Sequence, residues 1–410
     1  MRQDIDGATL VEMRVAKKKQ LAQALEDARR RTLHLLDHYE AALGPSMTVP
    51  LAQNLNPPRW EFGHVGWFTD WWVNRNPDCA FGLDANPRAD RLTARQARRG
   101  INADALYDSS TVAHDDRWNL DLPSTAQTRT DLIDSLADTL ACLEAAREDD
   151  RGLYFFRLAL FHEDMHAEAF SYMAQSLGFD PGAELHQGRA REPQATDLSI
   201  DAAEAQLGYG GTGFCFDNEL GLHVVQTNAF KIDSRALSWG RFLPFIEAGG
   251  YNDPRWWDEA GWRWRCDGQH EFPRYLRAGA KHPYEILHFG RWQALDPFAT
   301  AVHLSAFEAQ AWCRWAGRRL PTEAEWVRAA QLNADFAWGQ VWEWTASAFE
   351  PFPGFTPHPY RDYSQPWFDG RPVLKGACSA TRARMRHTQY RNFSRPDRSD
   401  IFAGFRSVAL

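Results

Sequence analysis

The first half of the chain alternates apolar and polar residues with the period of an α-helix. In four stretches the apolar positions recur every three or four residues, which gathers them on one side of each predicted helix. Ser124 and Gln127 form the S-x-x-Q pattern of a helix N-terminus, and glycine with proline follows the first and fourth stretches. The predicted helices cover residues 13–44, 60–74, 124–147 and 151–177. Four long helices joined by loops predict a four-helix bundle.

The pattern changes beyond the fourth helix. Residues 187–196 are polar and are interpreted as part of a linker, and after Leu207 the chain is rich in Gly, Trp, Pro and short apolar runs. Helical periodicity survives mainly at 238–248, 305–317 and 322–331. Short strands and long loops are expected elsewhere, so the predicted fold class is α+β. The predicted division is a helical bundle (1–190), a linker (191–206) and a second domain (207–410).

Composition narrows the classes of function. The 410 residues are 44% hydrophobic and carry a net charge of −8, which fits a globular protein and disfavours a nucleic-acid partner. No apolar run is long enough to span a membrane, and no signal peptide is evident. The six cysteines are scattered without a CxxC pair, which predicts reduced thiols and a cytoplasmic location. The 18 tryptophans predict dense aromatic packing, with a minority available to line a site.

The strongest chemical signal lies in the fourth predicted helix. His162 and His166 are four residues apart, so both imidazoles lie on one side of the helix and can reach one metal ion. His64, on the aromatic second helix, is the candidate third ligand. A spacing of four alone is weak, because His34 and His38 share it in an unremarkable helix. Acidic neighbours and the bundle interior favour the first pair as a metal site.

The identity of the metal stays open at this point. Three neutral imidazoles with open coordination positions suit zinc and iron equally. His162-Glu163-x-x-His166 also matches the HExxH pattern of zinc metalloproteases, with Glu163 as general base. In that alternative Glu184 or His186 supplies the third ligand.

The second half contains motifs that identify a family. Residues 318–330, 339–345 and 404–406 resemble the formylglycine-generating-enzyme-like (FGE-like, sulfatase-modifying) fold, a relative of C-type lectins. Together with a histidine-bearing bundle, this domain resembles the ergothioneine-type sulfoxide synthases, whose bundle is of the damage-inducible (DinB-like) type. The resemblance implies that His64, His162 and His166 bind non-haem iron(II), with O2 as co-substrate. It also implies the substrate hercynine, a betaine of histidine whose imidazole C2 is joined to a thiol as a sulfoxide.

The chain departs from the better-known members at the substrate-binding segment. Where enzymes that use γ-glutamylcysteine read Arg-Asn-Trp-Asp, this chain keeps Asn392 but has Phe393 and Ser394, and Met165 replaces a frequent Gln. These four residues and Arg398 are the candidate substrate-binding residues. Loss of a carboxylate that pairs an ammonium favours a hydroxyl-rich donor.

These departures resemble the selenoneine synthases, which join hercynine to a selenosugar through a selenoxide intermediate. The alternative is a thiol donor such as cysteine, γ-glutamylcysteine or a thiosugar. A non-catalytic bundle fused to a lectin-like binding module is a further hypothesis.

Two tyrosines are candidate catalytic residues. Some members of the family use a tyrosine to donate a proton or an electron, and Tyr360 and Tyr363 lie in the matching region, where Phe355 is an alternative occupant of the site. Arg117, in the loop after the second helix, is predicted to be a solvated side chain or a ligand for a substrate carboxylate.

Overall fold

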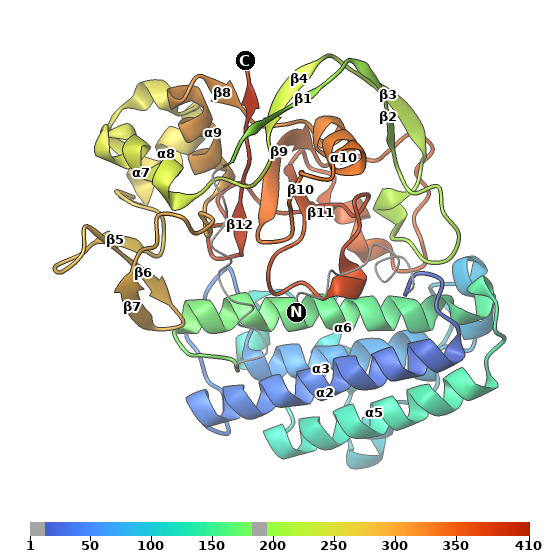
Figure 1. The fold of residues 1–410 in the computed structure, drawn as a ribbon. Helices are drawn as coiled ribbons and strands as arrows, with labels where there is room; N and C mark the ends of the chain where they lie inside the picture. The colour runs from blue at the N-terminus through green and yellow to red at the C-terminus, as the bar shows by residue number, and fades with distance from the viewer. Residues whose placement is uncertain (1–12, 183–194) are drawn as a thin grey trace, which may run out of the picture.

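The computed structural model describes residues 13–182 and 195–410. Four long helices lie side by side at the bottom of Figure 1, and the sheets and shorter helices of the second half lie above them. Helix α6 separates the two parts, with the other long helices on one side and the sheets on the other. The mixture of helices and sheets confirms the α+β class. Within the described residues, every helix is too short or too polar to cross a lipid bilayer.

The four predicted helices of the first half are present. They are α2 (Lys18–Leu43), α3 (Pro58–Thr69), α5 (Thr125–Ala145) and α6 (Asp150–Leu177), with the short α4 (Ala103–Tyr107) between the second and third. Helix α2 packs against α5 and α6, and α3 packs against the same two helices, which makes a four-helix bundle. Ser124 caps α5 through the predicted capping box with Gln127.

One helix start differs from the prediction, and the end of another helix is reached in a different helical form. Helix α2 begins at Lys18 rather than at residue 13. The buried Arg14 points to the second half of the molecule instead, where it donates two hydrogen bonds of 3.0 and 2.7 Å to Glu219. The second predicted helix continues past α3 as a π-helix, Asp70–Asn74, in which Arg75 N–H donates to the carbonyl of Asp70.

The second half consists of small sheets joined by helices and long loops. Two four-stranded sheets have the orders β1-β4-β13-β8 and β11-β10-β9-β12, and β2-β3 and β5-β6-β7 form smaller antiparallel sheets. The first strands are β1 (Asp197–Ile200), β2 (Ala203–Leu207), β3 (His223–Thr227), β4 (Phe230–Asp233), β5 (Leu276–Ala278), β6 (Tyr284–His288) and β7 (Arg291–Ala294). The later strands are β8 (Arg318–Arg319), β9 (Trp342–Ala348), β10 (Pro372–Gly376), β11 (Asn392–Phe393), β12 (Ala403–Gly404) and β13 (Val408–Ala409).

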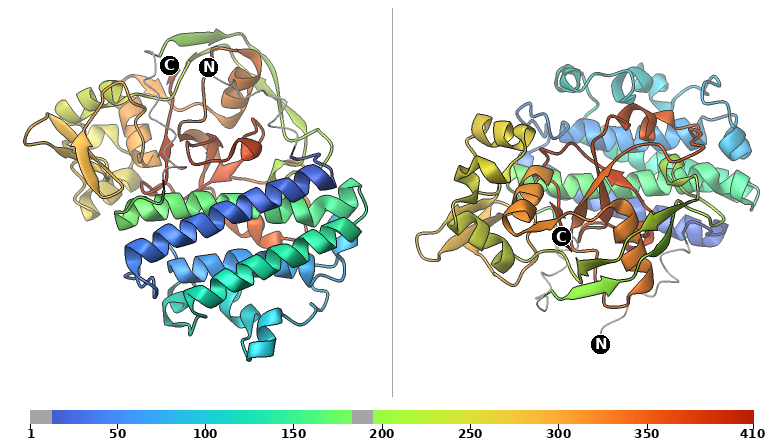
Figure 2. Two further views of the ribbon diagram at one scale, coloured as in Figure 1. Left: turned by 60° about the horizontal axis from the view of Figure 1, so that its bottom comes forward. Right: turned by 90° about the horizontal axis from the view of Figure 1, so that it is seen from above.

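The helices of the second half follow the predicted periodicity, with one addition. They are α7 (Trp239–Glu247), α8 (Glu259–Asp267), α9 (Ala306–Trp315) and α10 (Glu323–Leu332), of which α8 was not predicted. Seen from above in the right-hand view, the central sheets and α10 lie over the long helices of the bundle, whereas α7 and α8 extend beyond one end of them (Figure 2).

The predicted linker is corrected where the structure describes it. Strand β1 pairs with β4 and β2 pairs with β3, so most of residues 197–206 belong to sheets. Alternating burial of Ala205 and Leu207 on β2 shows why a polar composition misled the prediction: only one face of this strand packs on the core. Residues 191–194 of the predicted linker lie outside the described residues.

Side chains of α6 connect the two halves of the molecule. The indole N–H of Trp342 in β9 donates to Glu168 at 2.6 Å, and Arg384 forms a two-pronged ion pair with Asp164. Near the end of α6, Gln175 bonds the backbone on both sides of residue 288. The space between the halves is therefore lined by one rigid helix and several loops.

Candidate metal centre and substrate cavity

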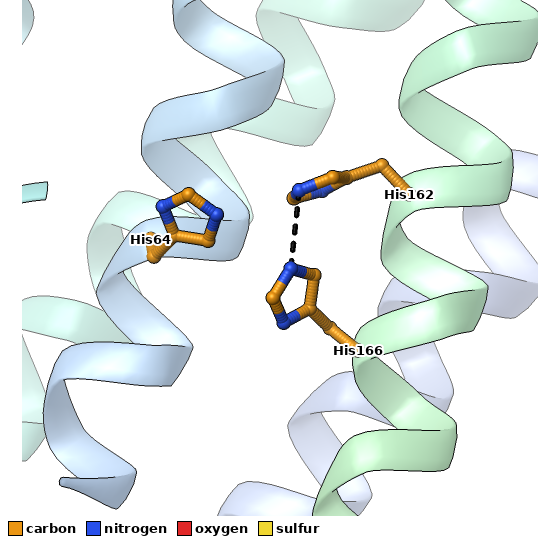
Figure 3. A group of neighbouring side chains, drawn as sticks. All are labelled: His64, His162 and His166. Atoms are coloured by element: carbon orange, nitrogen blue, oxygen red, sulfur yellow. Dashed lines mark hydrogen bonds between the residues drawn. The ribbon is translucent and has the colours of Figure 1, made fainter. Parts of the chain in front are cut away.

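Two helices present the three predicted metal-ligating histidines to one another. His162 and His166 are one turn apart on α6, and His64 faces them from α3 (Figure 3). Helix α6 begins where Asp149 caps it and ends at Gly178, whose left-handed backbone (φ 81°) lets its N–H bond to Ala174 O. This regular helix therefore runs unbroken through the site.

The ring nitrogens are spaced for a single ion. One ligand atom from each of the three imidazoles lies within 4.8 Å of the others, and the Nε2 atoms of His162 and His166 are 3.1 Å apart. A metal–nitrogen bond is about 2.0–2.1 Å long, so two ligands of one ion lie at such a separation. Among the described residues, this is the one cluster of three or more His, Cys, Asp or Glu side chains with that spacing.

The outer nitrogens of two imidazoles are held by hydrogen-bond acceptors. His64 Nδ1 lies 2.8 Å from the carbonyl oxygen of Tyr107, and His166 Nδ1 lies 2.5 Å from Glu61 Oε1. Since a carbonyl and a carboxylate accept, each Nδ1 carries the proton and each Nε2 keeps its lone pair for a metal. Gly63 allows this approach, because a Cβ there would lie 2.2 Å from the Tyr107 ring.

Burial sets the protonation of the cluster. Burial, with the nearby His166, lowers the pKa of His64 to about 3 and that of His162 well below its usual value. Burial alone would raise the pKa of Glu61, but the adjacent His166 outweighs it and lowers that pKa to about 2. A neutral His64 and a neutral His162, with an ionised Glu61 beside the third histidine, are states that a metal site requires.

The zinc-protease alternative is wrong about Glu163. Its carboxylate points to α2, where it accepts from Arg29 Nε and Nη2 at 2.8 and 3.0 Å, and from the Thr32 hydroxyl at 2.6 Å. A general base needs access to a metal-bound water, and this carboxylate is buried in an ion pair with α2. The alternative third ligands, Glu184 and His186, lie outside the described residues.

A cavity of about 210 Å³ lies between α6 and the second half of the molecule. All five predicted substrate-binding residues line it: Met165, Asn392, Phe393, Ser394 and Arg398. Met165 directly precedes His166 on α6, so the cavity and the histidine cluster share this helix, although none of the three histidines lines the cavity. Asn392 and Phe393 reach it from β11, which pairs with β10.

Sequence reasoning missed several other residues of the cavity. Asp164, Glu168 and Tyr172 line it from α6, and Trp342, Thr381 and Tyr390 line it from the opposite side. Glu168 accepts from the Thr381 hydroxyl at 2.5 Å as well as from Trp342, and burial raises its pKa. Spacing on α6 is the signal that could have found them, since residues 164, 165, 168 and 172 recur at helical intervals.

The two predicted catalytic tyrosines, Tyr360 and Tyr363, are not part of the cavity lining. The ring of Tyr360 is 6.3 Å from that of His162, measured between centroids. The hydroxyl of Tyr363 lies 3.1 Å from that of Tyr390, which in turn donates to Met165 Sδ at 3.5 Å. Tyr390 is thus the tyrosine of this group that faces the cavity directly.

The two candidate arginines are engaged with the protein. Arg398 lines the cavity but donates twice to Asp400, at 2.7 Å each. Arg117 donates to Asn56 at 2.7 Å, and its guanidinium lies 4.1 Å from the ring centre of Trp60, which stacks on His64. Arg117 is therefore held against the bundle, contrary to the prediction of a solvated side chain.

Comparison with known proteins gives matches over the second half and over the whole chain. A family model described as the sulfatase-modifying factor enzyme 1-like domain matches residues 183–340. Hercynine oxygenase of Mycolicibacterium thermoresistibile is 30% identical and covers 96% of this chain and 95% of its own length. Hercynine oxygenase of Mycobacterium tuberculosis is 29% identical over 95% of this chain and 98% of its own. The formylglycine-generating enzyme of Streptomyces coelicolor is 30% identical over 39% of this chain and 56% of its own.

A histidine cluster in a bundle, joined to a domain related to sulfatase-modifying factors, defines the class as an oxidoreductase of two-part architecture. The full-length similarity is more specific. The chain belongs to the hercynine oxygenase family, the ergothioneine-type sulfoxide synthases that its motifs resemble.

Proposed function

We propose that this chain is a non-haem iron(II)- and O2-dependent synthase that joins C2 of hercynine to the selenium of a selenosugar. The observation that carries the proposal is the cluster of His64, His162 and His166, together with a cavity that shares helix α6 with it and is lined by Asn392, Phe393 and Ser394. The proposal includes a DinB-like bundle within residues 1–190 and a C-type-lectin-like, FGE-like domain that comprises residues 207–410 and the strands β1 and β2 before them. Six free cysteines fit a reducing compartment, so a cytoplasmic location belongs to the proposal.

The donor set supports a resident metal. Three imidazole ligands leave coordination positions free, and His64 and His166 are each oriented by an acceptor on the outer nitrogen. A bound iron(II) ion supplies O2 activation and the redox chemistry of the reaction. The protein holds the three nitrogens in place and buries His64 and His162, while the His166 side chain is 19% exposed, which limits the access of water to the reacting groups.

The lining of the cavity supports a betaine as the substrate. Hercynine, the betaine in the names of the relatives, is the proposed one. Aromatic faces of Phe393, Trp342 and Tyr390 line the cavity together with the Glu168 carboxylate, and both kinds of group attract a quaternary ammonium. The Asn392 amide supplies a donor for the substrate carboxylate. Met165 offers an apolar, polarisable surface next to the metal ligands.

The choice of donor rests on Ser394. A hydroxyl lines the cavity where the enzymes using γ-glutamylcysteine have a carboxylate, and the Thr381 hydroxyl lies in the same lining. Hydroxyl groups match a neutral sugar, whereas an amino-acid thiol would leave its ammonium without a carboxylate at this position. A thiol donor remains the alternative, because Asp164 and Glu168 also line the cavity.

The overall reaction balances with O2 alone as oxidant. The C2–H and Se–H bonds break, the C2–Se bond forms, one oxygen atom is added to selenium to give the selenoxide, and the other leaves as water. Tyr360 and Tyr363 are proposed to support the proton transfers, with the Tyr390 hydroxyl linking Tyr363 to the cavity.

The test is a competition between donors. Protein reconstituted anaerobically with iron(II) is given hercynine, O2 and equal amounts of a selenosugar, the matching thiosugar, cysteine and γ-glutamylcysteine, and products are followed by mass. The selenosugar adduct is expected to form fastest. Faster formation of a sulfoxide would favour the thiol alternative, and no coupled product with any donor would reject the function.

A further inference from the structure

One carboxylate holds both ends of the loop that carries the two candidate tyrosines. The loop spans residues 358–364, and Asp217 lies across from it in the segment that precedes β3. The backbone N–H of His358 donates to Asp217 Oδ2 at 3.4 Å, and the Ser364 hydroxyl donates to Asp217 Oδ1 in a short hydrogen bond. Asp217 therefore closes a seven-residue loop with its two oxygen atoms.

The closed loop directs its tyrosines toward the site from two sides. Tyr360 packs edge-on against Phe68, at 4.9 Å between ring centres, and Phe68 stacks on His162 at 3.4 Å. Tyr363 stacks on Phe216, the residue before Asp217, at 4.2 Å, which places its hydroxyl beside that of Tyr390. A shift of the loop would move both rings away from these neighbours.

Asp217 is buried in surroundings that disfavour an ionised carboxylate. Asp217 is 1% exposed, and burial raises its pKa to about 6. Its carboxylate interacts electrostatically with Tyr360 and Tyr363 of the loop. Tyr154 of α6 and, from the segment of Asp217 itself, Cys215 and Glu219 also interact with it. Burying a carboxylate among mainly neutral donors is unfavourable in free energy. The hydrogen bonds that offset this at Asp217 come from the two ends of the loop.

A second attachment ties the same loop to the metal-bearing helix. The Tyr154 hydroxyl lies 3.0 Å from His358 Nδ1, and Tyr154 is two turns before His162 on α6. Asp217 holds the loop on one side and α6 holds it on the other. These attachments fix the position of the loop relative to the histidine cluster on α6.

We propose that Asp217 is a positioning residue, which holds loop 358–364 so that Tyr360 and Tyr363 stay aligned with the histidine cluster and Tyr390. Asp217 touches neither the histidines nor the cavity lining. Its role in turnover rests on the proposed function, whereas its role in ordering the loop does not. Misplacing a catalytic group by about 1 Å costs on the order of 100-fold in rate.

The molecule offers a matched control. Asp233 Oδ2 accepts from both the backbone N–H and the hydroxyl of Ser407, at 2.9 and 2.6 Å, and Asp233 is 2% exposed. This bridge joins β4 to the C-terminal segment and does not involve the tyrosine loop. Ser364→Ala and Ser407→Ala therefore each remove one hydroxyl from a buried carboxylate, but only the first affects the loop.

The test combines hydrogen exchange with kinetics on the full chain. For Asp217→Ala we expect exchange of amides in 358–364 to rise at least about 10-fold and kcat to fall by about 100-fold, with iron content and the KM for hercynine little changed. Asp217→Asn is the rescue variant, because its amide oxygen accepts from His358 and its NH2 donates to the Ser364 hydroxyl. Ser364→Ala is expected to show the same changes at about a tenth of the size.

The outcomes separate the two proposals. A wild-type chain that makes no product rejects the proposed function, while hydrogen exchange still tests the loop. If Asp217→Ala does not fold, Ser364→Ala measured against Ser407→Ala decides. Equal effects of these two serine variants on loop exchange and kcat, or a fall in Tm without either change, would overturn the positioning role.

Discussion

The bundle and the second half of the molecule build the site by different means. The three histidines stand on two regular helices, so their spacing follows from the helix period and the packing of α3 on α6. The opposite wall of the cavity comes from β9, β10, β11 and the loops around them. Helices fix a metal position closely, whereas loops allow the substrate-binding surface to vary. Mutations in the two regions should therefore separate metal binding from substrate use.

The largest effect is expected in the bundle. His162→Ala should reduce bound iron to a trace and abolish turnover, because it removes one of three ligands. His34→Ala is the control, since it removes an exposed imidazole that has the same four-residue spacing to His38. Metal analysis and product formation check both variants. Retention of iron by His162→Ala would contradict the proposed ligand set.

Substitutions of two carboxylates near the histidines, Glu61 and Glu163, should have very different effects on iron affinity. Glu61→Gln weakens the acceptor at His166 Nδ1, so iron affinity is expected to fall by about 10–100-fold. Glu163→Gln should leave affinity within about threefold but lower Tm, because it breaks the buried pair with Arg29. Competition with a chelator measures affinity. Loss of activity at normal iron content in Glu163→Gln would revive a catalytic role for this residue.

The cavity wall should respond in substrate use and not in metal content. Asn392→Ala is expected to raise the KM for hercynine by about 10–100-fold, the loss of a hydrogen bond to a charged group, with iron unchanged. Steady-state kinetics and metal analysis on the same preparation test this. A loss of iron in this variant would break the separation between the two regions.

A smaller change is expected in the choice of donor. Ser394→Asp puts a carboxylate into the cavity, so the ratio of kcat/KM for γ-glutamylcysteine over the selenosugar should rise by about 10-fold. Ser394→Asn, a similar size without charge, is the control. An unchanged ratio in Ser394→Asp would separate residue 394 from donor recognition.

The smallest effect concerns stability in the second half. Burial lowers the pKa of Lys375, beside Glu323, to about 8 from 10.5. Between these values the unfolded chain binds more protons than the folded chain, so stability should rise as the pH rises from about 8 to 10.5. Lys375→Met should lack this rise. Tm measured across the window for both chains tests it, and parallel curves would contradict the shifted pKa.

Local patterns in the sequence determined the helices and the histidine pair. Apolar periodicity located four bundle helices, and a spacing of four put His162 and His166 on one side of α6. The family motifs pointed to the residues of β11 that line the cavity. These features depend on neighbours within a few residues, which a sequence displays directly.

Only the tertiary structure decided which groups surround the site. Glu61 contacts His166 although the two are 105 residues apart in the sequence, and Trp342 contacts Glu168 although these are 174 residues apart. The HExxH pattern suggested that Glu163 is a general base. The pattern could not show its ion-pair partner, because Arg29 lies 134 residues earlier, on another helix. Side-chain direction and long-range contact depend on how helices and loops pack, and no local period encodes that packing.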